Sequence, residues 1–121
     1  MDRENLHGKV AIITGGSTEV AAAVAQALAR EGVQICLCGR QMDLLNLAAE
    51  KINTDGGSCL IHCSVLESLE NAEAVVEHAR SGLGGLDILI MVSPFWSGGQ
   101  IHNHSVRTWD LVLDANLREP F

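Results

Sequence analysis

The segment 14–18 (TGGST) carries the residues best suited to chemistry in this chain. Thr14, Gly15, Ser17 and Thr18 place hydroxyl groups and a tight turn directly after an apolar run and directly before a helical pattern. The first amides of a helix have no partner inside it and lie at the positive end of its dipole. A pyrophosphate at that point accepts hydrogen bonds from these amides. The segment therefore predicts an anion-binding turn, with a plain strand-to-helix turn as the alternative.

The elements on both sides of this turn must position it. An apolar, β-branched run at residues 10–13 predicts a strand that is buried on both faces. From Val20 onward, apolar residues recur at helical spacing and predict one apolar helix face. That face comprises Val20, Ala23, Val24, Ala27 and Leu28. Ser17 or Thr18 can cap this helix, and Gly32 follows it where a left-handed residue is favourable. Strand, glycine turn and helix form the first half of a dinucleotide-binding unit.

The rest of the chain repeats the alternation of strand and helix. Further strands are predicted at 33–38, 58–65 and 86–93, and further helices at 42–53, at 69–81 and from Thr108 onward. This alternation predicts an α/β fold, a doubly wound parallel sheet of the Rossmann type with right-handed crossovers. The length of 121 residues suits a single domain, 1–121, but is short for a complete dinucleotide-dependent enzyme.

Composition restricts the partners and the compartment. The formal net charge of −7 argues against a nucleic-acid partner and provides no basic stripe for an anionic membrane. No apolar segment approaches the length that spans a bilayer. The polar N-terminal residues are unlike a signal peptide. We therefore expect a cytoplasmic protein with neither a nucleic-acid nor a membrane partner.

The first turn resembles that of the short-chain dehydrogenase/reductase family, which reads T-G-x-x-x-G-x-G. Thr14 and Gly15 match the start of this motif, and an alanine-rich helix follows. Glu19 and Ala21 stand where the family has its second and third glycines. Alanine in place of the third family glycine, at Ala21, is a mild change. The backbone of Glu19 would lie where the diphosphate approaches, and its carboxylate either repels the phosphates or points outward and interacts favourably with the helix dipole.

The resemblance assigns further residues to the cofactor and implies the strand order 3-2-1-4. Arg40 follows the second strand, where family members that prefer NADP carry a basic residue, and its guanidinium suits a 2′-phosphate. A solvated loop arginine is the alternative. Ser64 stands where the family has an acidic residue that receives the adenine amino group. Ser93 ends the fourth strand beside the cofactor, after Met91 and Val92, which replace family asparagines. NADP is the expected cofactor, with NAD less favoured.

A second stretch resembles the family near the C-terminus. Residues 109–117 (WDLVLDANL) follow the family pattern W-D-x-V-x-D-V-N-L. Asn116 matches the family asparagine that helps to hold a proton-relay water beside the active-site lysine, which implies a catalytic role. The alternative is a helix residue whose amide bonds to a local carbonyl.

The chemistry that the resemblance implies needs residues that are absent here. Family members transfer a hydride between a nicotinamide cofactor and an alcohol or carbonyl compound, with a tyrosine as general acid/base beside a lysine. This chain contains no tyrosine, and the family places the tyrosine and lysine beyond position 121. We therefore expect the cofactor-binding half of an NADP-preferring oxidoreductase, truncated before the catalytic segment. A non-catalytic binding or pairing module is the alternative.

Two further expectations concern the sheet and the cysteines. The apolar strand at 86–93 becomes a sheet edge if the chain stops at 121, so we expect self-association or pairing with a related subunit. The four cysteines lie on two neighbouring predicted strands, which makes a zinc or redox site conceivable. They are Cys36, Cys38, Cys59 and Cys63. Because their spacings are unlike common metal motifs, we expect buried thiols and no metal site. His102 and His104 are expected at the surface.

Overall fold

Strands and helices alternate along the chain, as the sequence predicts. The computed structural model describes residues 5–92 and 97–121. The four strands are β1 (Val10–Thr14), β2 (Gln34–Gly39), β3 (Cys59–Cys63) and β4 (Ile88–Met91). The helices are α1 (Glu19–Arg30), α2 (Met42–Thr54), α3 (Leu69–Leu83), the 3-10 turn η2 (Ile101–Asn103), α4 (Val106–Leu113) and the π-helical turn η3 (Asp114–Arg118).

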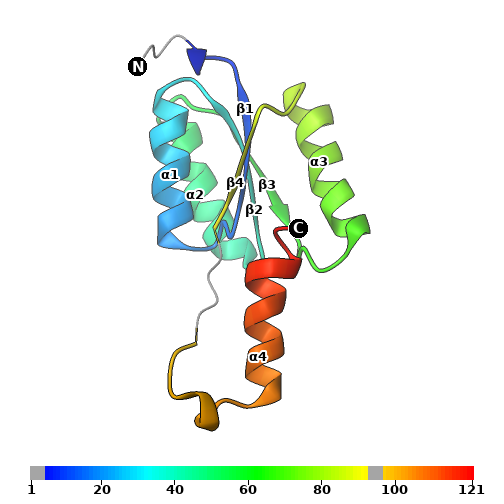
Figure 1. Cartoon of the computed structure of the whole chain (residues 1–121). Coiled ribbons are helices and arrows are strands. Elements are labelled where there is room, and N and C mark those ends of the chain that lie inside the picture. The colour runs from blue at the N-terminus through cyan, green and yellow to red at the C-terminus, as the bar shows by residue number, and fades with distance from the viewer. Residues whose placement is uncertain (1–4, 93–96) are drawn as a thin grey trace.

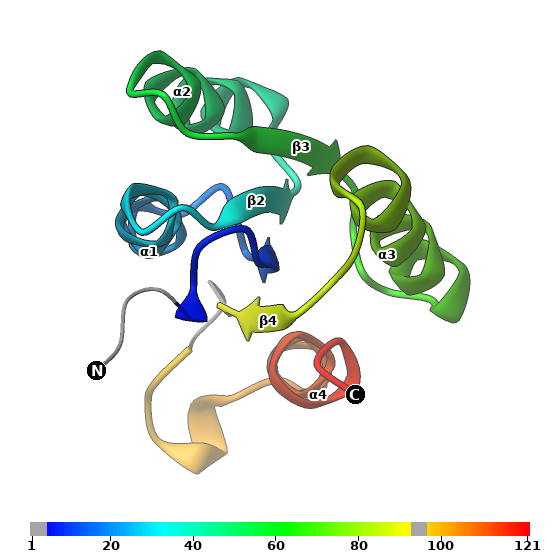
Figure 2. The same cartoon turned by 90° about the horizontal axis from the view of Figure 1, so that it is seen from above.

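The four strands form one parallel sheet in the order β3-β2-β1-β4, which confirms the predicted fold class and strand order. Helices α1 and α2 cover one face and α3 covers the other (Figures 1 and 2). The carboxyl ends of all four strands therefore lie at the same edge. The chain runs outward from β1 to β3 and then returns to place β4 on the other side of β1. This reversal creates a topological switch point between β1 and β4, where open α/β sheets bind ligands.

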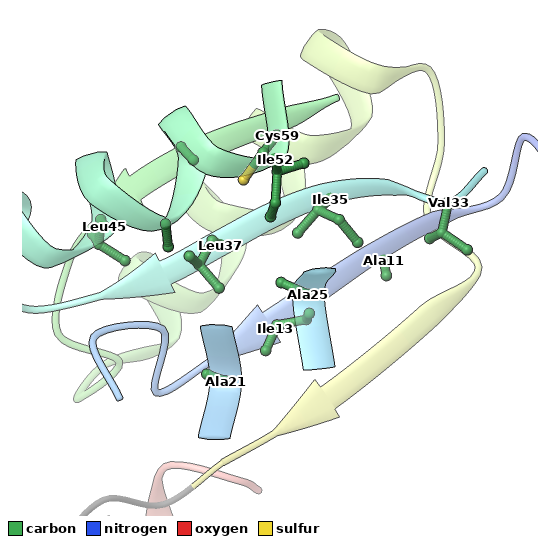
Figure 3. Close-up of a cluster of buried hydrophobic side chains, with 12 residues drawn as sticks. Ala11, Ile13, Ala21, Ala25, Val33, Ile35, Leu37, Leu45, Ile52 and Cys59 are labelled. Carbon is green, nitrogen blue, oxygen red and sulfur yellow. The ribbon is translucent and has the colours of Figure 1, made fainter. Parts of the chain in front are cut away.

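The core consists of two apolar clusters, one on each side of the sheet. The larger joins inward-facing strand residues to α1 and α2 and includes Ile13, Ile35, Leu37, Leu45 and Ile52 (Figure 3). The smaller lies beneath α3 and contains Ile12, Cys36, Cys38, Val75 and Ala79. Because strands β1 and β2 are covered on both faces, almost every residue in them is apolar. This accounts for the uninterrupted apolar run at 10–13.

The apolar face predicted for α1 is correct only in part, because Val24 and Leu28 pack against the core but the fully buried residues are others. Ala21 and Ala25 are fully buried and point toward the sheet in Figure 3, whereas Val20 is 62% exposed. Ala23 and Ala27 are also exposed. An alanine-rich helix has little hydrophobic periodicity, so the position of its first turn sets the buried face. The small side chains at positions 21 and 25 let α1 lie close to β1 and β2.

Several element ends differ from the prediction. Strand β3 ends at Cys63 and β4 at Met91, earlier than expected, so Ser64 lies in the loop that follows β3. Helix α4 begins at Val106 because the Ser105 hydroxyl caps it, accepting a hydrogen bond from the Thr108 amide at 3.0 Å. Within the described ranges, none of the helices combines the length and the apolarity that crossing a bilayer requires.

Candidate functional site

The turn after β1 is held by contacts on both sides. Gly15 has a φ of +66°, in the left-handed region that favours glycine. A β-carbon at this position would overlap the carbonyl oxygen of Val92, just beyond β4. The amide of Gly16 donates a hydrogen bond to the Cys38 carbonyl at the end of β2, at 2.7 Å. The turn is therefore hydrogen-bonded to β2 and lies close against the backbone of Val92 after β4, at the switch point of the sheet.

The hydroxyl groups of the turn fix the start of α1. Thr18 is the N-cap, and its Oγ1 accepts a hydrogen bond from the Ala21 amide at 3.2 Å and donates one to the Gly15 carbonyl at 2.8 Å. Ser17 Oγ accepts a hydrogen bond from the Gln41 amide at 3.0 Å, which ties the turn to the start of α2. Both hydroxyls thus hold the turn in place. The Ala21 amide is thereby capped, so the amides of Glu19 and Val20, which have no acceptor within the helix, are the donors that this end of α1 offers to an anion.

Glu19 is the first residue of α1, and its side chain is exposed. A carboxylate in the first turn interacts favourably with the positive end of the helix dipole. Ala21, in the place of the third family glycine, is fully buried in the core. Its methyl group therefore fits between α1 and the sheet.

Arg40 and Ser64 follow β2 and β3 at the same edge as the turn. Arg40 Nη2 donates a hydrogen bond to Oε1 of Glu119 at 3.0 Å, so Arg40 is paired and is not simply solvated. The Ser64 amide donates to the Gly39 carbonyl at 2.9 Å, and its hydroxyl donates to the Val65 carbonyl at 3.4 Å. The structure thus brings the first turn, Arg40 and Ser64 to one edge of the sheet.

The remaining two predicted residues lie elsewhere or outside the described range. Ser93 falls outside the described residues. Asn116 lies in the π-helical turn η3, and its Nδ2 donates a hydrogen bond to the Val112 carbonyl at 2.9 Å. This bond to a local carbonyl is the one that the alternative interpretation expects. Single π turns inside helices often occur at functional sites.

The cysteines lie on opposite faces of the sheet. The register pairs Ile35 with Cys59 and Cys36 with Leu60, and residues in register point to the same side. Cys36 and Cys38 therefore face α3, whereas Cys59 faces α2, which excludes a joint four-cysteine site. Burial raises the pKa of Cys36 to about 11 and that of Cys38 to about 12. These thiols are protonated at neutral pH. In the part of the chain that the structure describes, no three potential metal-ligand side chains gather at one point.

The sequence interpretation missed two pairs of side chains. One is the pair of Arg40 with Glu119. The other is His62 on β3 with His78 on α3, whose Nδ1 atoms lie 3.0 Å apart. Burial lowers the pKa of His62, and His78 lowers it further. Neither pair has a local sequence signal, because its members are far apart in the chain and meet only in the folded sheet.

A shallow hollow, mainly apolar with three charged residues at its lining, lies along α4 and η3. Its lining includes Trp109, Leu113, Leu117 and Phe121, which follow one another at four-residue spacing. This spacing places them on one face of the helix. None of the residues predicted to bind the cofactor lines this hollow.

The model of the short chain dehydrogenase family matches residues 9–121. The chain belongs to this family. An uncharacterized oxidoreductase of Staphylococcus haemolyticus is 34% identical over 113 residues, which cover 93% of this chain and 48% of that protein. A dehydrogenase/reductase from Sinorhizobium meliloti 1021 superposes with a TM-score of 0.89 at 30% identity, over 95% of this chain and 46% of the other. L-sorbose reductase from Gluconobacter frateurii, solved with NADPH and L-sorbose, gives a TM-score of 0.85 at 33% identity, over 94% and 44% of the two chains.

The match covers only one part of these oxidoreductases. The chain spans about half the length of the Staphylococcus relative and of both solved structures. The β1–α1 turn lies within the residues that the family model matches.

Proposed function

We propose that the carboxyl edge of the sheet binds a nicotinamide dinucleotide, with NADP preferred over NAD. The observation that carries the proposal is the turn at Gly15, which is left-handed, is hydrogen-bonded to β2 through Gly16 and lies close against the Val92 backbone at the switch point. The start of α1 supports the binding of a pyrophosphate, because Thr18 caps the Ala21 amide and leaves the amides of Glu19 and Val20 without an acceptor in the helix. The solved NADPH complex of L-sorbose reductase, a related fold, supports the choice of cofactor.

Each site residue has a proposed role at this edge. Thr14, Gly15, Ser17 and Thr18 shape the phosphate turn. The Arg40 guanidinium forms forked hydrogen bonds to the 2′-phosphate that distinguishes NADP from NAD. We propose that Ser64 contacts the adenine, that Ser93 borders the cofactor, and that Asn116 takes part in proton relay.

The proposed activity is the transfer of a hydride between NADP(H) and an alcohol or carbonyl substrate. The bound cofactor supplies or accepts the hydride. The 121 residues contribute the cofactor-binding half and contain no tyrosine to act as general acid/base. We therefore propose that the tyrosine and lysine of this chemistry come from protein outside these residues.

Titration of the purified chain with NADPH and NADH tests the cofactor proposal through the change in nucleotide fluorescence. We expect saturable binding, tighter for NADPH. Arg40→Gln should weaken NADPH about tenfold to a hundredfold, because hydrogen bonds to charged groups contribute about 1.5–3 kcal/mol, and should leave NADH nearly unchanged. Arg30→Gln is the matched control, since it removes the same charge at the far end of α1. Equal loss in the two variants would contradict the role of Arg40, and no binding of either nucleotide would refute the site.

A second candidate function is a binding or pairing module, and the apolar surface of β4 favours it. Leu89 is 55% exposed and Met91 is 49% exposed. Within the described residues β4 pairs with β1 alone and forms an edge of the sheet. Such an edge offers unpaired backbone groups to another strand. We propose that the chain self-associates or pairs with a related subunit through this edge.

Light scattering on the isolated chain tests the pairing proposal. We expect a dimer or larger species, and Leu89→Lys should shift it toward monomer. Val76→Lys on α3 is the matched control, because it places the same charge at another exposed apolar position. A monodisperse monomer at all concentrations would contradict the proposal.

We also propose a cytoplasmic location, which the unpaired cysteines support because thiols persist in reducing compartments.

A further inference from the structure

The side chain of Arg40 is held by a residue near the other end of the chain. Its Nη2 atom lies 3.0 Å from Oε1 of Glu119, across 79 positions of sequence. Glu119 follows the π-helical turn η3, and its amide donates a hydrogen bond to the Asp114 carbonyl at 2.9 Å. Figure 1 shows α4 and the red C-terminal segment at the end of the molecule where the strands finish. The pair therefore lies at the edge that carries the proposed cofactor site.

The surroundings of Glu119 make Arg40 its counter-ion. The Glu119 side chain is 20% exposed, and that of Arg40 is 56% exposed. Burial raises the pKa of Glu119, and the nearby carboxylates of Glu67 and Asp114 raise it further. Arg40 opposes this effect through its charge and its hydrogen bond. The ionised form of Glu119 thus depends on the guanidinium.

We propose that Glu119 is a specificity-determining residue that competes with the 2′-phosphate of NADP for Arg40. The inference rests on the proposed function, in which Arg40 binds that phosphate. A carboxylate and a phosphate both present the anionic oxygens that a guanidinium fork binds. NADP must therefore displace Glu119 from Arg40. NAD has no 2′-phosphate and leaves the pair intact. Glu119 thus narrows the preference for NADP over NAD.

The competition is strong enough to measure but not strong enough to abolish binding. A partly exposed ion pair contributes up to about 1 kcal/mol, which is about fivefold in affinity. Repulsion between the Glu119 carboxylate and an approaching phosphate adds to this effect. We expect Glu119→Gln to tighten NADPH binding about threefold to tenfold. The affinity for NADH should change less than about twofold, because screening weakens more distant charges.

The experiment compares the dissociation constants of NADPH and NADH for five forms of the 121-residue chain. These are the unsubstituted chain, Glu119→Gln, Arg40→Gln, the double variant Arg40→Gln/Glu119→Gln, and Glu67→Gln. Glu67→Gln is the matched control, since it removes a nearby carboxylate for which the described contacts give no hydrogen bond to Arg40. Circular dichroism and the urea midpoint of each variant verify that the fold is retained. We expect the NADPH gain in Glu119→Gln only, and its disappearance in the double variant.

Each other outcome overturns the inference, and the outcomes separate it from the proposed function. If Glu119→Gln binds NADPH no more tightly while Arg40→Gln still weakens it, Glu119 does not compete and the cofactor site stands. If the gain persists in the double variant, or equals that in Glu67→Gln, a general loss of negative charge explains it. If neither the unsubstituted chain nor Glu119→Gln binds either nucleotide, the inference and the proposed function both fail.

Discussion

Replacing Gly15 with alanine tests whether the turn requires glycine for structural reasons, before any nucleotide binds. The φ of +66° places this residue in the left-handed region, where an alanine costs about 1–2 kcal/mol. In addition, the new methyl group would overlap the Val92 carbonyl oxygen, which belongs to the backbone and moves only with the end of β4. Relieving such overpacking typically costs about 1–3 kcal/mol. The sum is a loss of about 2–5 kcal/mol in the free energy of unfolding, a large share of the stability of a small domain.

Urea unfolding of the nucleotide-free chain, followed by circular dichroism, measures this loss. With a denaturant slope of about 2 kcal/mol per molar, the midpoint should fall by about 1–2.5 M. Gly56→Ala is the matched control, because Gly56 has a φ of +88° with no atom within 4 Å of the added β-carbon. It should show only the backbone component, about 1–2 kcal/mol. Equal losses in Gly15→Ala and Gly56→Ala would refute the reasoning, since the contact with Val92 would then contribute nothing.

Two further predictions concern the core and the histidine pair. Leu45→Ala should lower the free energy of unfolding by about 2–5 kcal/mol, because Leu45 is fully buried. Leu44→Ala, at an exposed position, should change this free energy by less than about 0.5 kcal/mol. Similar losses of stability in the two variants, measured by urea unfolding, would contradict the helix face assigned to the core. Because the pKa of His62 is lowered in the folded chain, the unfolded chain binds a proton at this residue more tightly than the folded chain does. Neutral His62 therefore favours the folded chain above pH 6.5, and this part of the stability is lost as the pH falls below that value. Between pH 7.5 and 5, His62→Gln should therefore lose less stability than the exposed control His102→Gln, as measured by thermal unfolding; an equal loss would contradict the effect of burial and of His78.

The order and type of the elements could be predicted from the sequence because they depend on local patterns. The apolar run at 10–13 indicates a strand covered on both faces, and the glycines and serines after it indicate a turn and a cap. Thr14 and Gly15 indicate the family turn in the same way, since both residues act within one short loop. The alternation of elements predicts a parallel sheet, and the family resemblance implies the observed strand order. The positions of Arg40 and Ser64 at one edge follow from that order.

Only the tertiary structure decided which side chains face one another. Sequence periodicity placed Val24 and Leu28 correctly but missed Ala21 and Ala25 as the fully buried residues of α1. Alanines at half of the positions leave the rotation of the helix to its packing against the sheet. The sheet register separated Cys36 from Cys59 and brought His62 to His78. Glu119 meets Arg40 across 79 positions, a contact that depends on where α4 lies and that no local pattern encodes. Short-range patterns determine the elements, and long-range packing determines their partners, because a side chain's neighbours exist only once distant segments have come together.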